Sequence, residues 1–238
     1  MRAAAPPLRR RRTAAIPGIL ASLLCGAAQA QWSGSVGIDS DYRFRGVSLG
    51  ASKPAVRFAV NHDAPGGWYG GASATESKVS PSGSYAQLLG YVGRVTPLAG
   101  AALDLGATGS AFFGDSRRDF GEAYAGLIFQ GGSVRANYSP SYFGGHQQTL
   151  YLQANSQLPL RSGWRLLGHL GALVPLTTSR SVLPHTSRVR ADLLAGVGWS
   201  ANELELTLAW TGATSGGPPP ASQAMRRGGW VLGATWFF

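Results

Sequence analysis

Polar and apolar side chains alternate through Glu203-Leu204-Glu205-Leu206-Thr207-Leu208-Ala209-Trp210-Thr211, a stretch of a 238-residue chain. Successive side chains of a β-strand point to opposite faces. The stretch therefore predicts a strand whose leucines and tryptophan face an apolar environment and whose glutamates and threonines face a polar one. A long helix is not expected, because the chain contains 34 glycines and they interrupt nearly every window that could hold one.

The same alternation recurs along most of the chain. It is clear in 32–45, 134–142, 150–155 and 189–200, and weaker in 54–62, 67–76, 84–93, 101–111, 120–130, 164–174 and 228–238. The apolar face of the first segment includes Tyr42 and Phe44, and that of the second includes Tyr142. Together the segments predict about twelve strands, each close to the ~9–11 residues that a tilted membrane-spanning strand needs.

The predicted connections fall into a short set and a long set. Short turns rich in glycine, proline or asparagine are expected at 63–66, 96–100, 131–132, 159–163 and 200–202. Longer connections are expected at the opposite strand ends, above all at 175–187 and 213–227. Short turns on one side and long loops on the other are typical of barrels of the bacterial outer membrane.

The composition favours a membrane barrel over a soluble sheet protein. Only 13% of the residues are charged, against about 25% in a soluble domain, and tryptophans lie near the predicted strand ends. A sheet in hydrocarbon must close, because unpaired backbone groups at its edges are costly there. We therefore expect an all-β fold, a transmembrane antiparallel up-and-down β-barrel over residues 31–238, in the bacterial outer membrane. A soluble β-sandwich is the alternative, because alternation alone does not say which face points inward.

Residues 1–30 have the pattern of a secretory signal peptide. Arg2 and the run Arg9 to Arg12 form a basic region, an apolar core follows up to Cys25, and Ala28-Gln29-Ala30 resembles a cleavage site. Removal of this segment leaves 16 basic against 11 acidic side chains, so the net charge falls from +10 to about +5. Half of the net positive charge therefore lies in the predicted signal peptide, and nucleic acid is not an expected partner.

The last predicted strand carries a possible assembly signal. Its apolar face contains Trp230, Leu232, Ala234, Trp236 and the final Phe238. This arrangement resembles the terminal strand that the barrel assembly machinery recognises in Gram-negative bacteria. The resemblance implies that Trp236 and Phe238 form the signal for that partner.

Three short motifs near the start of the predicted barrel resemble a known family. They are Ser40-Asp41-Tyr42-Arg43-Phe44-Arg45-Gly46-Val47-Ser48, Lys53-Pro54-Ala55 and Gly67-Trp68-Tyr69-Gly70-Gly71. They are similar to the TorF family of porins, also called the Gcw_chp family, over about residues 33–75. The resemblance implies an outer-membrane barrel that acts as a porin for small hydrophilic solutes.

The polar strand faces predict a charged lining. The strand period directs inward the pore-lining candidates Asp39, Asp41, Arg43, Arg45, Arg57, Arg135, Arg165, His169, Arg190 and Asp192, together with Asp104, Glu203 and Glu205. Two interpretations have equal weight: cross-strand ion pairs that fill and stiffen the barrel, or a charged path that selects solutes by size and sign. About twelve strands enclose more room than the eight that side chains can fill, so a water-filled passage is expected.

The long loops carry more positive than negative charge. Their charged residues are Lys53, Lys78, Arg117, Arg118, Arg180, Arg188, Arg226 and Arg227 against Glu76, Asp115 and Asp119. Such a surface is suited to contacting the phosphates of lipopolysaccharide or to drawing anions to the mouth, which suggests a mild anion preference. Solvated loop charges without a partner are the equally weighted alternative.

No catalytic residue, metal site or cofactor is expected. Gly46-Val47-Ser48-Leu49-Gly50 fits the G-x-S-x-G pattern of serine hydrolases, but the helix that this motif requires does not follow it. The four histidines lack the spacing that places two on one metal. Two alternatives to a porin stay open: a barrel enzyme of the phospholipase or deacylase type acting on membrane lipid, and a plugged structural or adhesive barrel.

Overall fold

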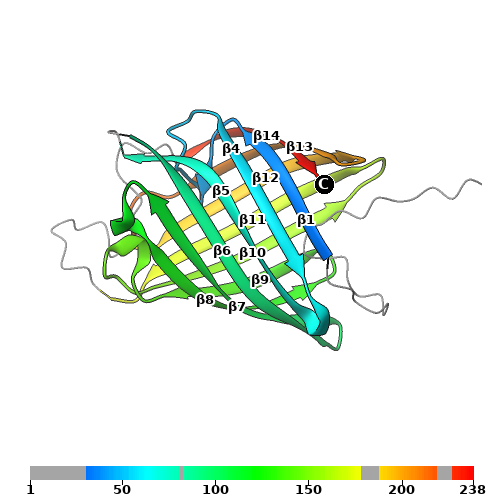
Figure 1. The fold of residues 1–238 in the computed structure, drawn as a ribbon, viewed down its shortest axis with the longest axis horizontal. Helices are drawn as coiled ribbons and strands as arrows, with labels where there is room; N and C mark the ends of the chain where they lie inside the picture. Colours follow the sequence, from blue (N-terminus) through cyan, green and yellow to red (C-terminus); the bar gives the residue numbers. More distant parts are fainter. Residues whose placement is uncertain (1–30, 81–82, 178–187, 219–226) are drawn as a thin grey trace, which may run out of the picture.

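The computed structural model describes residues 31–80, 83–177, 188–218 and 227–238. Twelve strands close into one antiparallel barrel (Figure 1). They are β1 (Gln31–Asp39), β4 (Ala55–Asp63), β5 (Trp68–Ser80), β6 (Gly83–Leu98), β7 (Ala101–Phe113), β8 (Phe120–Phe129), β9 (Gly132–Ser139), β10 (Thr149–Pro159), β11 (Trp164–Pro175), β12 (Arg190–Ala201), β13 (Leu204–Ala213) and β14 (Gly228–Phe237). The predicted signal peptide lies outside the described residues. No helix in the described part is long and apolar enough to cross a membrane.

The barrel closes where its first and last strands meet. Each strand pairs with the next barrel strand along the chain, and β1 also pairs with β14. At this seam Ser35 lies opposite Phe237, and Asp39 lies opposite Gly233. Closure leaves no free sheet edge in the hydrocarbon, as the backbone requires. The predicted up-and-down transmembrane barrel, with its strand count, is confirmed.

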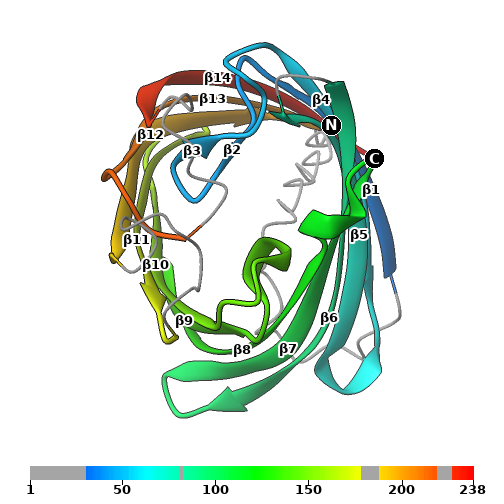
Figure 2. The same cartoon turned by 90° about the vertical axis from the view of Figure 1, so that its left-hand side faces the viewer.

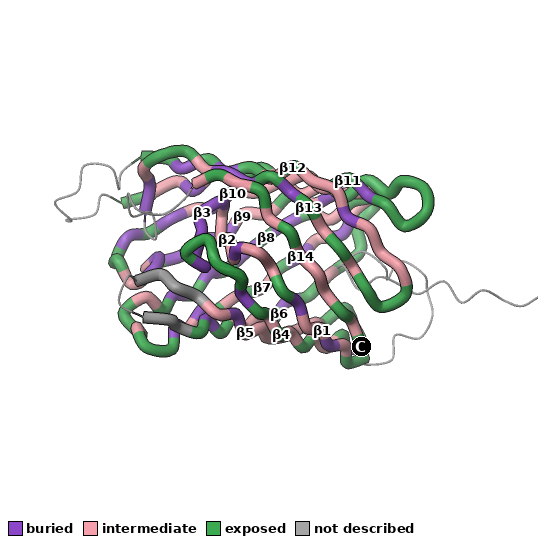
Figure 3. Tube along the Cα trace, turned by 90° about the horizontal axis from the view of Figure 1, so that it is seen from above, coloured by how far each residue is buried: buried purple, intermediate pink, exposed green. Residues whose placement is uncertain are grey.

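The outer surface of the barrel is apolar and the inner surface is polar. In β13 the side chains of Leu206 and Trp210 are exposed, whereas Thr211 is buried. Trp230 and Leu232 of β14 are 67% and 61% exposed. Burial alternates in the same way along the other strands (Figure 3). An apolar outer surface of this extent matches a lipid environment, because soluble monomers rarely expose large contiguous apolar patches.

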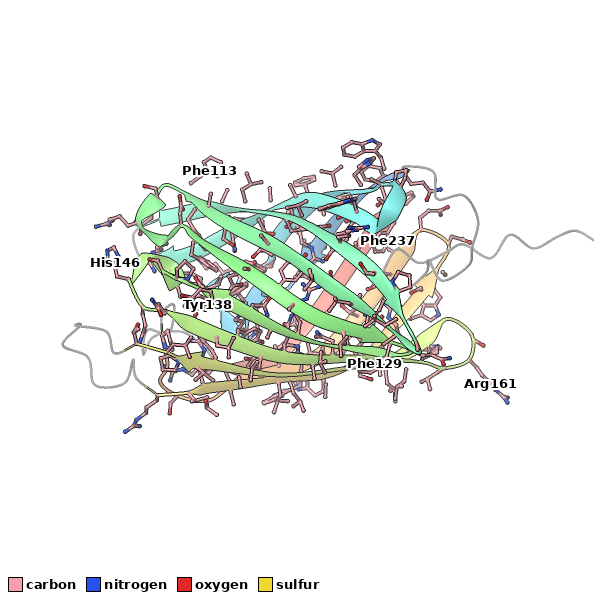
Figure 4. The ribbon with its side chains drawn as sticks, turned by 90° about the horizontal axis from the view of Figure 1, so that it is seen from below. Phe113, Phe129, Tyr138, His146, Arg161 and Phe237 are labelled. Carbon is pink, nitrogen blue, oxygen red and sulfur yellow. The ribbon has the colours of Figure 1, made fainter. Side chains whose placement is uncertain are left out.

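The two ends of the barrel differ in their connections. His146 and Arg161 lie at opposite ends in Figure 4, with His146 among the long loops and Arg161 in a short turn. The turn after β6 contains only Ala99 and Gly100, because that strand continues through Leu98. The predicted short turns thus lie at one end. The long connections predicted at 175–187 and 213–227 fall partly outside the described residues.

The first predicted strand is too long. β1 ends at Asp39, and the chain then turns into the barrel and forms the inner hairpin, made of β2 (Arg43–Phe44) and β3 (Val47–Ser48) (Figure 2). Positive φ angles at Arg45 and Gly46, 49° and 73°, reverse the chain between these two strands. The prediction that Arg43 and Arg45 belong to the barrel wall is therefore wrong, although both lie inside the barrel.

An aromatic cluster fills part of the barrel at the long-loop end. Its buried members are Leu49, Phe112, Phe120, Tyr142, Phe143, Tyr151 and Leu173, and Tyr42 and Phe44 pack against them. The prediction that Tyr42, Phe44 and Tyr142 face lipid is therefore wrong. These side chains come from segments that fold inward, where burial of each large apolar side chain contributes roughly 1.5–3 kcal/mol. The cluster holds the inner hairpin inside the barrel.

Candidate pore lining

Polar side chains on the inner face are satisfied mainly by one another. A charged group removed from water needs a partner, because desolvation would otherwise cost several kcal/mol (roughly). Five carboxylates in the barrel wall lie within ion-pair distance of a basic side chain. Four of them, Asp39, Asp104, Asp192 and Glu205, were predicted from the sequence, and the fifth is Glu122.

One network lies on strands β5, β7, β8 and β9. The Tyr69 hydroxyl donates to Asp104 Oδ1 at 2.5 Å, and Arg135 Nη2 donates to Asp104 Oδ2 at 2.5 Å. The hydroxyl groups of Tyr69 and Tyr124 are 2.6 Å apart, and the Arg135 guanidinium lies 4.2 Å from the Tyr124 ring centroid. Asp104 is almost completely buried, so Arg135 and Tyr69 replace its lost hydration.

A second network lies on strands β10, β11 and β12. His169 Nε2 is 2.8 Å from Asp192 Oδ1, and His169 Nδ1 is 2.7 Å from Asn155 Oδ1. The Tyr151 hydroxyl donates to Asp192 Oδ1 at 3.0 Å. Every polar atom of the imidazole ring is therefore held by the wall, and His169 is fixed in place by three side chains.

The inner hairpin is joined to the barrel wall, and to Tyr151 of the second network, through Arg45. Its Nη2 donates to Glu122 Oε2 of β8 at 2.6 Å. Its guanidinium also lies 3.9 Å from the ring centroid of Tyr151 and 5.2 Å from that of Tyr142. An ion pair combined with cation–π contacts fixes the hairpin across the interior. Glu122 was not among the predicted lining residues, because it lies on a strand whose alternation is weak.

The base of the inner hairpin is held by a second set of contacts. Arg43 Nε lies 2.9 Å from Asp41 Oδ2, and Ser48 Oγ donates to Asp41 Oδ1 at 2.6 Å. The Ser52 N–H donates to both Asp41 Oδ1 and Ser48 Oγ. Ser48, the serine of the G-x-S-x-G match, thus stabilises a turn through a carboxylate.

The hairpin tip touches the barrel wall. A Cβ added at Gly46 would lie 2.7 Å from the Gly212 carbonyl oxygen and 2.8 Å from Asp192 Cβ. These atoms belong to β13 and β12. The glycine is therefore needed both for the positive φ angle and for the close approach.

The remaining predicted lining residues lie on β1, β4 and β11 to β13. Arg165 pairs with Glu205, and its Nη1 donates to Ser200 Oγ at 2.5 Å. Arg57 lies 3.8 Å from Asp39, and the Arg57 side chain is 38% exposed. Glu203 is in the turn before β13 and is exposed, so its predicted place on the strand face is wrong.

Arg190 differs from the other inner arginines. It is completely buried, and its Nη1 donates to the Pro218 carbonyl oxygen at 2.7 Å. Its Nε and Nη2 atoms have no hydrogen-bond partner among the described residues. No carboxylate in the described part lies within 4 Å of its guanidinium. Arg190 therefore contributes a positive charge without an ion-pair partner among the described residues, and Asp192 acts on it only from farther away.

Part of the predicted loop charge is neutralised locally. Asp115 accepts from Arg118 Nε at 2.8 Å and from Arg117 Nε at 3.1 Å. The hydrogen bond from Arg118 lowers the pKa of Asp115 below its usual value. Asp119 Oδ1 accepts the Phe112 N–H at 2.7 Å. Arg180, Arg226 and the Lys78 side chain lie outside the described residues.

Within the described ranges, no group of three or more histidine, cysteine, aspartate and glutamate side chains is arranged to hold a metal ion. His62, for example, stacks on Trp32 with ring centroids 4.4 Å apart. His169 is held by one carboxylate, one amide and one phenol. Its contacts include no second histidine, so this part of the structure offers one imidazole rather than a ligand set.

Comparisons with known proteins agree with this architecture. A family model described as "Bacterial protein of unknown function (Gcw_chp)" matches residues 25–218. No protein with a curated description matches the chain. The NanC porin has a TM-score of 0.58 at 8% identity, and the KdgM porin has 0.55 at 10%; each comparison covers 87% of this chain and 99% of the other. The KdgM porin in complex with disordered oligogalacturonate has 0.54 at 9% identity, with the same coverage. At these identities the similarity concerns the fold.

Proposed function

The chain belongs to the Gcw_chp family, and we propose that it is a porin of the bacterial outer membrane through which small hydrophilic solutes diffuse passively. The observation that carries the proposal is the distribution of side chains across the closed wall. Trp230 and Leu232 are exposed on the outside, while Asp104 and Asp192 are buried inside. A closed sheet that is apolar outside and polar inside is suited to lipid around it and water within it.

The proposal includes a mild preference for anions. Within the described wall, Asp104, Glu122 and Glu205 each pair with an arginine, so their charges are largely offset. Arg190 has no carboxylate at ion-pair distance among the described residues, although Asp192 acts on it from farther away, and a buried charge is only weakly screened by salt. Its field favours solutes of negative sign. The similar KdgM porin is known in complex with oligogalacturonate, which is consistent with a barrel of this type admitting a hydrophilic chain.

Export, assembly and surface contacts are part of the same proposal. Residues 1–30 would direct export, and Trp236 and Phe238 would be read by the barrel assembly machinery. Trp236 and Phe238 are 54% and 76% exposed on the outer surface, where a partner has access to them. The outward-facing Arg117 is suited to lipopolysaccharide phosphates, because its side chain is 91% exposed despite its contact with Asp115.

A plugged barrel is the second candidate, and one observation favours it. The aromatic cluster and the inner hairpin occupy part of the interior at the long-loop end. The barrel-enzyme alternative has weaker support. Ser48 contacts Asp41 rather than a histidine, and His169 contacts Tyr151, Asn155 and Asp192 but no serine. A serine nucleophile would need a general base within hydrogen-bond reach.

Single-channel recording of the refolded protein in a planar bilayer tests the proposal. A porin gives discrete conductance steps, and in a salt gradient its reversal potential has the sign of anion preference. The absence of conductance steps would favour the plugged barrel. A reversal potential that favours cations would overturn the anion preference alone. Release of fatty acid from lipid vesicles by the purified protein would instead support the enzyme.

A further inference from the structure

Three tyrosines on one side of the barrel, within four consecutive strands, lie along the inner wall. Tyr69 is on β5, Tyr91 on β6 and Tyr124 on β8. In the strand register Tyr69 is opposite Gly93, Tyr91 is opposite Gly71, and Tyr124 is opposite Gly106. Each tyrosine thus faces a residue without a side chain on the adjacent strand.

The glycines make room for the phenol rings. A Cβ at Gly71 would lie 2.6 Å from the Tyr91 hydroxyl oxygen, and a Cβ at Gly93 would lie 2.6 Å from the Tyr69 hydroxyl oxygen. These distances are too short for any real side chain. The rings therefore extend sideways over the adjacent strand instead of across the interior. An aromatic side chain that covers a cross-strand glycine in this way also stabilises the sheet.

The phenol groups are fixed at their polar ends. Tyr69 donates to Asp104, and Tyr91 donates to Asn61. Because both hydroxyl groups have protein partners, the two rings are held in one orientation before any solute arrives. A fixed ring loses little conformational entropy when it binds a ligand. The ring centroids of Tyr69 and Tyr91 are 6.1 Å apart and their planes meet at 50°, so together they form a bent aromatic surface.

The exposure of these rings is more than a purely structural role requires. Tyr124 is 6% exposed and lies beneath its neighbours, as a space-filling residue would. Tyr69 and Tyr91 are only half-buried. The Arg135 side chain, which shares the partner Asp104 with Tyr69, is 22% exposed, so N–H groups not used by Asp104 remain within reach of a solute. Aromatic surface and hydrogen-bond donors therefore occur together on one wall.

We infer that Tyr69 and Tyr91, with Arg135 linked to Tyr69 through Asp104, form a stacking site for the pyranose ring of a sugar that passes through the barrel; the inference rests on the proposed porin function. A pyranose has one face of C–H groups and an edge of hydroxyl groups. The C–H face packs against an aromatic face, and the hydroxyl groups accept and donate hydrogen bonds at its edge. An acyclic polyol of similar mass has the hydroxyl groups but no fixed C–H face.

The test measures how solutes block the ion current of the refolded protein in a planar bilayer. Methyl glucoside is compared with mannitol, which has similar mass and no ring. We expect methyl glucoside to block the current at lower concentration than mannitol. Tyr91→Leu should weaken the glucoside block about five-fold, whereas Tyr91→Phe, which keeps the ring, should retain it. Tyr138→Leu removes a tyrosine that is 39% exposed on the outer surface and should leave the block unchanged.

The outcomes separate the two proposals. Conductance with equal block by the two solutes, or equal block in Tyr91→Leu and the unaltered protein, would overturn the stacking site and leave the porin intact. A protein without conductance would overturn the porin and the stacking site with it. A shift in gel migration on heating verifies that each variant forms the barrel. If Tyr91→Leu does not fold, Tyr69→Leu is tested in its place.

Discussion

Arg45 Nη2 lies 2.6 Å from Glu122 Oε2, although the two residues are 77 positions apart in the chain. Both side chains are more than nine-tenths buried. The contact joins the inner hairpin to β8 on the barrel wall. A buried ion pair of this kind is costly to break by removing one partner, because the other charge is left without a counter-ion.

Glu122→Ala should release the inner hairpin from the wall. We expect the free energy of unfolding to fall by about 3–5 kcal/mol, since Arg45 would be left buried and unpaired. The single-channel conductance should rise as the hairpin leaves the interior. Urea unfolding in lipid and bilayer recording measure the two effects. Asp115→Ala removes an ion-pair partner from an exposed loop and serves as the control; an equal response of the two variants would contradict the role of the hairpin.

Arg190→Gln should shift ion preference toward cations. The variant removes an inner charge that has no ion-pair partner among the described residues, while the glutamine amide can still donate to the Pro218 carbonyl oxygen. Arg190→Lys keeps the charge and should restore the anion preference. Reversal potentials in a salt gradient give the ratio of permeabilities. Arg161→Gln, in an exposed short turn, is the control, and an unchanged ratio in Arg190→Gln would assign Arg190 to a structural role.

Phe238→Ser should reduce the amount of protein assembled in the outer membrane. Phe238 is 76% exposed on the outer surface, so the substitution removes little internal packing and acts on recognition. Phe113→Ser is a suitable control because Phe113 is 62% exposed at the opposite end of the barrel. A substitution of Phe143 would be a poor control, because Phe143 is buried in the aromatic cluster. Fractionated membranes probed for folded protein give the yields, and equal yields for both variants would argue against an assembly signal.

Gly93→Ala should destabilise the barrel, and Gly90→Ala should not. A Cβ at Gly93 would overlap the Tyr69 ring, which must then move away from Asp104. Overpacking of this kind costs about 1–3 kcal/mol. Nothing lies within 4 Å of a Cβ at Gly90. Urea unfolding compares the two variants, and matching midpoints would show that the Tyr69 ring adapts freely.

Alternation located the barrel strands because a lipid-facing surface and a polar interior impose the period of two on every strand. It could not distinguish lipid from an apolar cluster inside the barrel. Tyr42 and Phe44 keep the same period as β1 but pack against the aromatic cluster. The positive φ angles at Arg45 and Gly46, which reverse the chain within the inner hairpin, leave no signal in the hydrophobic pattern.

The sequence predicted that the lining contains ion pairs, but not which residues form them. Asp104 and Arg135 are 31 positions apart, and their pairing depends on the register of three strands. A shift of one residue in either pairing would turn one side chain to the opposite face. The sequence predicts the face of each residue but not the register. For the same reason the tyrosines and their opposing glycines could not be matched from the sequence alone.

In the proposed porin, the pairing of the inner charges affects how fast a solute would travel. A carboxylate next to an arginine presents a dipole, whose field fades with distance more quickly than that of a single charge. An ion that passes such a wall would therefore bind only weakly at each point. Weak binding is needed for transport, because an ion that binds tightly does not leave. Arg190 and the Tyr69–Tyr91 surface are then the places where residence time, and with it discrimination between solutes, would accumulate.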